Sequence, residues 1–243
     1  ARIISIDTSG AEADPEVRAV ITSADFPEPS EKRDECSNIM ARGKVLYKGH
    51  AVAAVVATSR HAAELALSLI DVKYEKLQAV TEVREAMKDG APQLHEEYKN
   101  NITSHDQSVL GDIEAGFAQA DVIVEREFTT QMVHQGYIEP HSATASWDGH
   151  GKVTVWGSSQ GHFQIGESTA ELLGVPSSSV KVIPMEIGGG FGGKTRVYLE
   201  PLAALLSGKT GVPVKLTMSR AEVMEATGPT SGGYMKVKMG ATN

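Results

Sequence analysis

The stretch Gly188-Gly189-Gly190-Phe191-Gly192-Gly193-Lys194-Thr195 decides how this chain is interpreted. Five of its eight residues are glycine, and glycine loses more backbone entropy on folding than any other residue, so the cluster needs a physical reason. One reason is a backbone that approaches another molecule closely, with its N–H groups turned toward an anion. The apolar pattern predicts a strand at 180–187 before the loop and a helix near 199–206 after it.

The composition is that of an ordinary globular protein. The 243 residues suggest one large or two small domains, with 41% apolar and 22% charged residues. A net charge of -8 without a basic stripe argues against nucleic-acid binding, and the short, interrupted apolar runs predict no transmembrane helix. Cys36 is the only cysteine, which rules out an internal disulfide, argues against a cysteine-ligated metal or iron–sulfur site, and is compatible with the cytoplasm.

Strand-like and helix-like runs alternate along the chain. Strands are expected at 1–7, 17–22, 45–47, 51–57, 72–74, 122–128, 143–147, 152–156, 181–187, 214–217 and 234–243. Helices are expected at 59–70, capped by Ser59, and at 83–88, 113–119, 162–173, 199–207 and just after Ser219. In the helix at 59–70, Ala62, Leu65, Ala66, Leu69 and Ile70 share one face. The polar stretch 99–112 is the best candidate linker, which divides the chain into 1–98, 99–112 and 113–243.

The loop also matches the G-x-x-x-x-G-K-[ST] pattern of phosphate-binding loops, from Gly188 to Thr195. Three features argue against a nucleotide. No Asp follows Thr195 to hold magnesium, and Pro201 would break a helix that began at Lys194. The ring of Phe191 would also lie where phosphates should bind. A phosphate-loop nucleotide-binding protein is therefore kept as an alternative only.

An ordered set of motifs resembles the large subunit of the molybdenum hydroxylases, the family of xanthine dehydrogenase, aldehyde oxidase, carbon monoxide dehydrogenase and 4-hydroxybenzoyl-CoA reductase. The glycine loop resembles the family's pterin-cofactor loop. Ser158-Ser159-Gln160 resembles its Ser/Thr-Gln pair, and Phe191 follows Gln160 by 31 residues, a spacing that the family keeps. The segments 137–141 and 172–176 resemble family segments too, and the first 98 residues resemble its α/β hammerhead domain.

This resemblance implies an α+β fold, in which an α/β hammerhead domain precedes the first part of a mixed α/β molybdopterin-binding domain. It implies a molybdenum–pterin cofactor, either molybdopterin or its cytosine dinucleotide. Gln160 would hydrogen-bond an oxo ligand of molybdenum, since its amide donates without adding charge. The backbone of Gly189, Gly190, Phe191 and Gly192 would also bind the cofactor, with the peptide at Phe191 and Gly192 against the metal centre.

The same resemblance implies part of a hydroxylase or dehydrogenase acting on heterocycles, aldehydes or aromatic thioesters. The partners would be the remainder of the large subunit and iron–sulfur and FAD subunits or domains. In the family the catalytic glutamate lies in a later segment, so no residue here is assigned as catalytic and this chain alone is expected to be inactive. Thr195 stands where purine hydroxylases often carry a glutamate, which makes xanthine a less expected substrate. A non-catalytic scaffold or maturation module with the same fold is the other alternative.

Several of these residues also have a purely structural interpretation. Gln160 could be a polar residue at a strand end, and Phe191 could be a core anchor that pins the loop. Glu139, which precedes Pro140, is interpreted as structural. The four histidines nearest these motifs are expected to be isolated surface or turn residues: His134, His141, His150 and His162.

Overall fold

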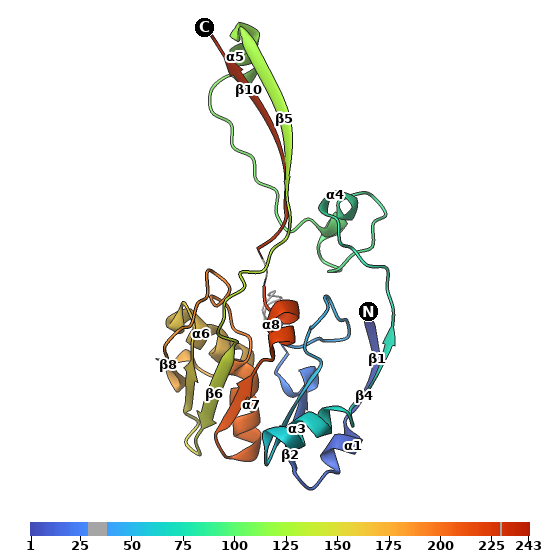
Figure 1. Cartoon of the computed structure of the whole chain (residues 1–243), viewed down its shortest axis with the longest axis vertical. Coiled ribbons are helices and arrows are strands. Elements are labelled where there is room, and N and C mark those ends of the chain that lie inside the picture. Colours follow the sequence, from blue (N-terminus) through green and yellow to red (C-terminus); the bar gives the residue numbers. More distant parts are fainter. Residues whose placement is uncertain (29–37, 229) are drawn as a thin grey trace. The chain divides into compact units, whose positions relative to one another are not determined.

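In a computed structural model, the chain is described over residues 1–28, 38–228 and 230–243 (Figure 1). Its contacts form two compact units, one of Ala1–Leu77 with His134–Gly228 and one of Gln78–Val133 with Pro229–Asn243. Cys36 lies outside the described residues, so the predictions for it stay predictions. Within the described ranges, no helix has the length and apolar character needed to cross a membrane.

A four-stranded sheet is the framework of the first unit, with the strand order β8-β7-β6-β9. The antiparallel strands β6 (Ser142–Trp147) and β7 (Val153–Gly157) form the predicted hairpin. In its turn, Asp148 Oδ1 accepts the N–H groups of His150 at 2.9 Å and Lys152 at 2.8 Å. β9 (Val214–Thr217) lies antiparallel to β6, and β8 (Val180–Pro184) lies parallel to β7.

Two helices pack on this sheet; the first has its predicted limits, and the second starts near its predicted residue but extends to Thr210, beyond the predicted 207. α6 (His162–Leu173) connects β7 to β8 and ends at Gly174, which adopts a left-handed conformation with φ 67°. α7 (Glu200–Thr210) carries Pro201 in its first turn, where a missing N–H costs nothing. The helix therefore starts at Glu200 and not at Lys194, as expected from the position of the proline.

The N-terminal residues build two-stranded ribbons and short helices. β1 (Arg2–Asp7) pairs with β4 (Asp71–Glu75), and β2 (Val17–Thr22) pairs with β3 (Ala53–Ala57). The short helix α1 (Ser9–Glu12) follows β1, and the 3-10 turn η1 (Ser23–Asp25) follows β2. α3 (Arg60–Leu67) follows β3, and Ser59 caps it as predicted by accepting the Ala62 N–H at 3.2 Å.

Two predictions for this region are wrong. No strand forms at 45–47, because the Leu46 N–H donates to His50 Nδ1 at 3.2 Å and Gly49 turns the chain with φ 88°. The helix predicted at 59–70 is shorter, because α3 ends at Leu67; on the predicted face Ala62 and Ala66 are buried, while the leucines at 65 and 69 are about half exposed. The helix packs closely on β3, so small residues occupy the contact.

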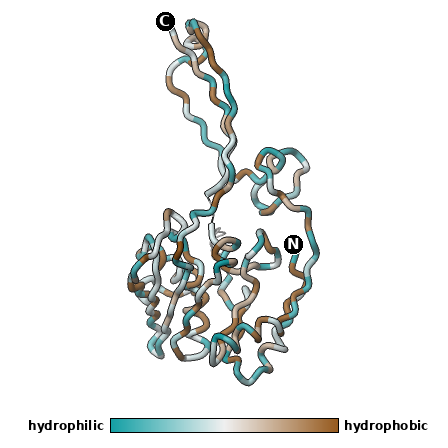
Figure 2. The backbone as a smooth tube through the Cα atoms, in the orientation of Figure 1, coloured by the Kyte–Doolittle hydropathy of each residue, from teal (hydrophilic) through white to brown (hydrophobic). Residues whose placement is uncertain are grey.

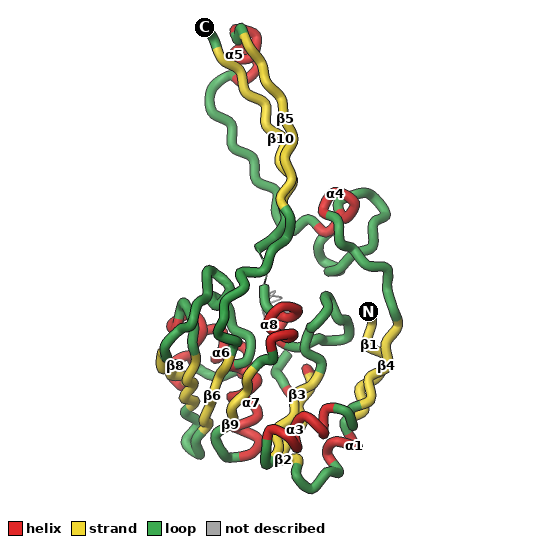
Figure 3. The backbone as a smooth tube through the Cα atoms, viewed as in Figure 1, coloured by secondary structure: helices red, strands yellow, loops and turns green. Residues whose placement is uncertain are grey.

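The second unit is built on an antiparallel ribbon of β5 (Val122–Thr130) and β10 (Gly233–Ala241). The helices α4 (Val83–Ala86) and α5 (Ile113–Gln119) and the 3-10 turn η2 (Lys99–Asn101) belong to the same unit. Residues 102–112 carry no helix or strand (Figure 3), in keeping with their polar composition. Apolar residues recur along the ribbon (Figure 2), and one of its faces gathers six exposed side chains: Val122, Val124, Phe128, Met235, Val237 and Met239.

The main core contains residues from both sequence segments of the first unit. Ile21, Phe26 and Met40 share one buried cluster with Val155 and Leu206 of the sheet and its helix. Lys209 of α7 also forms an ion pair with Asp25 of η1. The N-terminal ribbons therefore help to bury the helix that follows the glycine loop, although they lie far from it in sequence. The domain limits 1–98, 99–112 and 113–243 stay a prediction.

Ser207 offers a direct test of how α7 is fixed to the sheet. Its fully buried hydroxyl accepts the Trp147 N–H at 2.9 Å and donates to Val212 O at 2.8 Å. Ser207→Ala leaves both groups without their partner, which costs about 1–3 kcal/mol in the free energy of unfolding. Urea unfolding measures this loss. The exposed Ser178→Ala is the control, and equal stability of the two variants would contradict this packing.

Candidate functional site

The glycine loop, 188–195, lies between the end of β8 at Pro184 and the start of α7 at Glu200, and it contains backbone conformations that most residues avoid. Gly189, Phe191 and Gly192 have φ values of 95°, 50° and 89°. A positive φ is rare for a bulky residue such as phenylalanine, and it is typical of strained backbone at functional sites. At Gly190 the reason for glycine is space, because a Cβ there would lie 2.5 Å from Gln160 Oε1. The loop therefore depends on its glycines for both conformation and close approach.

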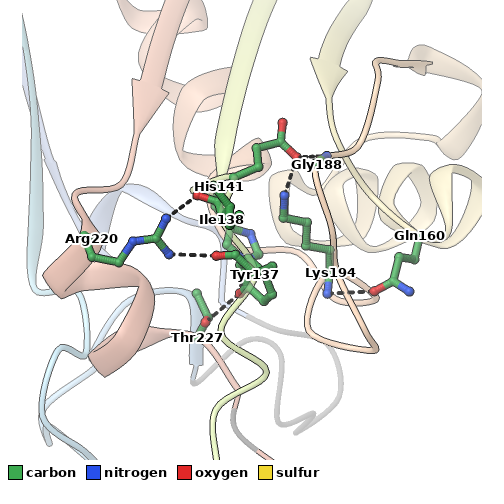
Figure 4. Close-up of polar contacts among 9 residues, drawn as sticks. Tyr137, Ile138, His141, Gln160, Gly188, Lys194, Arg220 and Thr227 are labelled. Carbon is green, nitrogen blue, oxygen red and sulfur yellow. Dashed lines mark hydrogen bonds and ion pairs between the residues drawn. The ribbon is translucent and has the colours of Figure 1, made fainter.

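Both the side chain and the backbone of Gln160 are hydrogen-bonded to the loop. Gln160 Oε1 accepts the backbone N–H groups of Gly192 at 3.0 Å and Lys194 at 3.1 Å. In return, the Gln160 N–H donates to the Lys194 carbonyl at 2.9 Å. Two donors on one oxygen fix the plane of the side-chain amide, so its nitrogen is directed away from the loop (Figure 4).

A buried lysine of the loop forms an ion pair with a partly exposed glutamate. Lys194 Nζ donates to Glu139 Oε2 at 2.5 Å, and the lysine side chain has no exposed surface while that of Glu139 is 31% exposed. The same Oε2 accepts the Gly188 N–H at 2.6 Å (Figure 4). Partial burial alone would raise the pKa of Glu139, but the bonds from Lys194 and Gly188 outweigh burial and lower it. Glu139 is therefore held as a carboxylate at neutral pH.

A polar chain of buried side chains supports the other side of the loop. Tyr137 OH lies 2.6 Å from His141 Nε2 and 2.9 Å from Thr227 Oγ1, and Thr227 Oγ1 donates to Val223 O at 2.7 Å. Thr227 thus uses its proton on the carbonyl, so Tyr137 donates to Thr227 and His141 donates to Tyr137. Burial lowers the pKa of His141 to about 4, and nearby Lys194 adds to the effect, so the imidazole is neutral at pH 7.

The helix α8 (Arg220–Ala226) anchors this segment from outside. Its start is fixed by the predicted Ser219 cap, in a capping box with Glu222. Arg220 donates to the carbonyls of Tyr137, at 2.9 Å, and Ile138 (Figure 4). The segment that carries Glu139 is therefore held from α8 on one side and from the glycine loop on the other.

The structure brings together most, but not all, of the residues singled out in the sequence. Gln160, Gly190 and Gly192 are in contact, as the motif spacing suggested. The ring of Phe191 is 75% exposed, so its interpretation as a core anchor is wrong. His150 lies exposed in a turn as expected, whereas His141 is only 6% exposed and part of a network.

The geometry argues against the phosphate-loop alternative. In such a loop the lysine extends to the phosphates, but here Lys194 is buried against Glu139. Two of the N–H groups that would face an anion are bound to Gln160. The pairing of Glu139 with Lys194 was missed in the sequence, where Glu139 was interpreted as structural. The only sequence signal for this ion pair was that residues of opposite charge, Glu139 and Lys194, each lie within a motif segment.

The polar atoms around the loop fit a bound cofactor. No described residue accepts a hydrogen bond from Gln160 Nε2, although the amide is held in one orientation. Gln135 Oε1 and Ser159 Oγ are buried and have no partner among the described residues. Buried polar atoms are usually paired, so unpaired ones next to a strained glycine loop are typical of a site that binds a polar group.

Comparison with known protein families gives two matches. Residues 94–243 match the molybdopterin cofactor-binding domain, and residues 1–78 match the aldehyde oxidase and xanthine dehydrogenase a/b hammerhead domain. These matches confirm the predicted fold class and the order of its two parts.

Individual relatives agree with the family matches. The chain is 33% identical to the nicotinate dehydrogenase large molybdopterin subunit of Eubacterium barkeri, covering 100% of the chain and 57% of that protein. It is 35% identical to the carbon monoxide dehydrogenase large chain of Afipia carboxidovorans, covering 100% of the chain and 32% of that protein. Aldehyde oxidoreductase from Desulfovibrio gigas superposes with a TM-score of 0.89 at 29% identity, covering 100% of the chain and 28% of that structure. The chain therefore spans less than two thirds of each of them.

The low pKa of His141 makes a prediction about stability and pH. In the unfolded chain the imidazole titrates near its ordinary value of 6.5, but in the folded state only near about 4. The unfolded state thus binds more protons between these values, so His141 lowers the free energy of unfolding by up to about 3 kcal/mol as pH falls from 6.5 to 4. Urea unfolding across this range measures the effect.

His141→Gln removes the titrating group and should make the pH dependence shallower over the same range. His150→Gln, at an exposed turn residue, is the matched control and should keep the slope of the original chain. Parallel slopes in all three proteins would mean that burial of His141 does not govern this dependence.

Proposed function

Because the chain belongs to the molybdopterin cofactor-binding domain family, we propose that its glycine loop and Gln160 form one wall of a molybdenum–pterin site. The cofactor-binding residues are Gln160, Gly189, Gly190, Phe191 and Gly192. The observation that carries this assignment is the oriented amide of Gln160, whose nitrogen has no partner among the described residues. The cofactor is molybdopterin or its cytosine dinucleotide.

Each of these residues has a task that follows from its geometry. Gln160 Nε2 donates a hydrogen bond to an oxygen ligand of the metal without adding charge. The peptide from Gly189 to Gly192 brings main-chain atoms close to the cofactor, since no side chain except Phe191 stands in the way. The exposed Phe191 ring shields the site from water. When bound, the molybdenum centre supplies the redox chemistry, and the protein supplies position and hydrogen bonds.

The complete enzyme is proposed to be a hydroxylase or dehydrogenase that acts on a heterocycle, an aldehyde or an aromatic thioester. The remainder of the large subunit would supply the catalytic base, and iron–sulfur and FAD subunits or domains would carry the electrons away. The family match supports this proposal, and the chain spans only 57% and 32% of the nicotinate dehydrogenase and carbon monoxide dehydrogenase relatives. We place the enzyme in the cytoplasm, and we expect no turnover from this chain alone. A scaffold or maturation module is the alternative, and a full gene product that folds but never retains cofactor would favour it.

Gly190→Ala tests the cofactor site directly. The new Cβ would lie 2.5 Å from Gln160 Oε1 and displace the amide. We expect the full gene product, made in a host that synthesises the cofactor, to bind the cofactor about tenfold more weakly, which corresponds to a loss of ~1.4 kcal/mol. Molybdenum and pterin content per subunit, measured on the purified protein over a dilution series, gives the result.

Gly149→Ala is the matched control, because Gly149 lies in an open turn with nothing within 4 Å of its Cβ position. This variant should keep the cofactor content of the original protein. If Gly190→Ala retains cofactor equally well, or if the original protein never contains any, the proposed site is wrong.

A further inference from the structure

Glu139 joins the two ends of the glycine loop through a single oxygen atom. Its Oε2 accepts the Gly188 N–H at 2.6 Å where the loop begins and the Lys194 ammonium at 2.5 Å where it ends. The Glu139 N–H also donates to the Gly188 carbonyl at 3.2 Å. A Cβ on Gly188 would lie 2.7 Å from Glu139 Cβ, so only glycine permits this approach. The Glu139 carboxylate therefore holds Gly188 and Lys194, the two ends of the loop, close together.

The charge of Lys194 makes this contact strong. The lysine side chain is fully buried, and a buried ammonium group is costly unless an anion and hydrogen bonds compensate it. Among the described residues, Glu139 is the carboxylate within ion-pair distance of Lys194 Nζ, and the Tyr137 ring lies 5.1 Å from the same atom. Opening the loop at this end would separate the pair, so the loop is held in one conformation.

Lys194 also connects Glu139 to Gln160. While its side chain is bound to Glu139, its backbone N–H and carbonyl are both bonded to Gln160, at 3.1 Å and 2.9 Å. The orientation of the Gln160 amide thus depends on the position of the Lys194 backbone, which in turn depends on Glu139.

We propose that Glu139 is a positioning residue, which closes the glycine loop through Lys194 and thereby aims the Gln160 amide at the cofactor. This proposal rests on the cofactor site proposed above. Glu139 acts in this proposal through its bonds to Gly188 and Lys194. Its role is to keep the loop and the amide in the binding geometry before the cofactor arrives.

The test compares loop mobility and cofactor retention in the full gene product. In cofactor-free protein, Glu139→Gln should speed amide hydrogen exchange in a peptide covering 188–194 about tenfold, because local opening becomes easier. In cofactor-loaded protein, the same change should speed the loss of molybdenum and pterin on dilution about tenfold, as expected for a less preorganised site. Glu186→Gln, an exposed carboxylate two residues before the loop, is the control and should change neither rate.

A double variant separates positioning from stability. Glu139→Gln with Lys194→Met removes the buried charge together with its partner, so the urea midpoint should return toward that of the original protein. Its loop should still exchange fast and its cofactor should still dissociate fast, because methionine cannot donate a hydrogen bond. Slow exchange and slow cofactor loss in this stable variant would overturn the proposal, as would unchanged rates in Glu139→Gln. If the original protein contains no cofactor, the proposed function is overturned instead. The hydrogen-exchange measurement on the loop uses cofactor-free protein, so it distinguishes the two failures.

Discussion

The side-chain oxygen of Gln160 accepts two backbone N–H groups from the glycine loop, and the geometry of the site depends on this pairing. Gln160 lies just after β7, while the loop lies between β8 and α7, so the bonds join segments that follow two neighbouring parallel strands of one sheet. It also decides which end of the amide is available. Because the oxygen is occupied, the nitrogen is left to donate, as the proposed contact with an oxygen ligand of the metal requires.

The strained backbone at Phe191 is held in place by other residues. Phe191 keeps a left-handed backbone with an exposed ring, which packing of its own side chain does not stabilise. The ion pair of the buried Lys194 with Glu139, the Tyr137 ring and the core around α7 supply the constraint instead. This division agrees with the general observation that strained functional backbone persists only where its surroundings over-determine it.

Much of this fold could be predicted from the sequence, and the failures have physical causes. Helix limits at Gly174, Ser59 and Ser219 followed from local capping rules, and the start of α7 followed from Pro201. The pairing of Glu139 with Lys194 could not be predicted, because it joins residues 55 positions apart and depends on the closed loop. His141 was expected to be a surface residue for a similar reason: its ring packs against Tyr198, which lies far from it in sequence.

We propose that Gln160 presents its amide nitrogen to a molybdenum–pterin cofactor lying against the loop from Gly189 to Gly192. A crystal structure of the full gene product with its cofactor bound is the decisive test. We expect Gln160 Nε2 to lie within hydrogen-bond distance of an oxygen ligand of the metal, with Oε1 still bonded to the loop. A cofactor bound elsewhere, or a Gln160 amide turned away from it, would refute this role of Gln160.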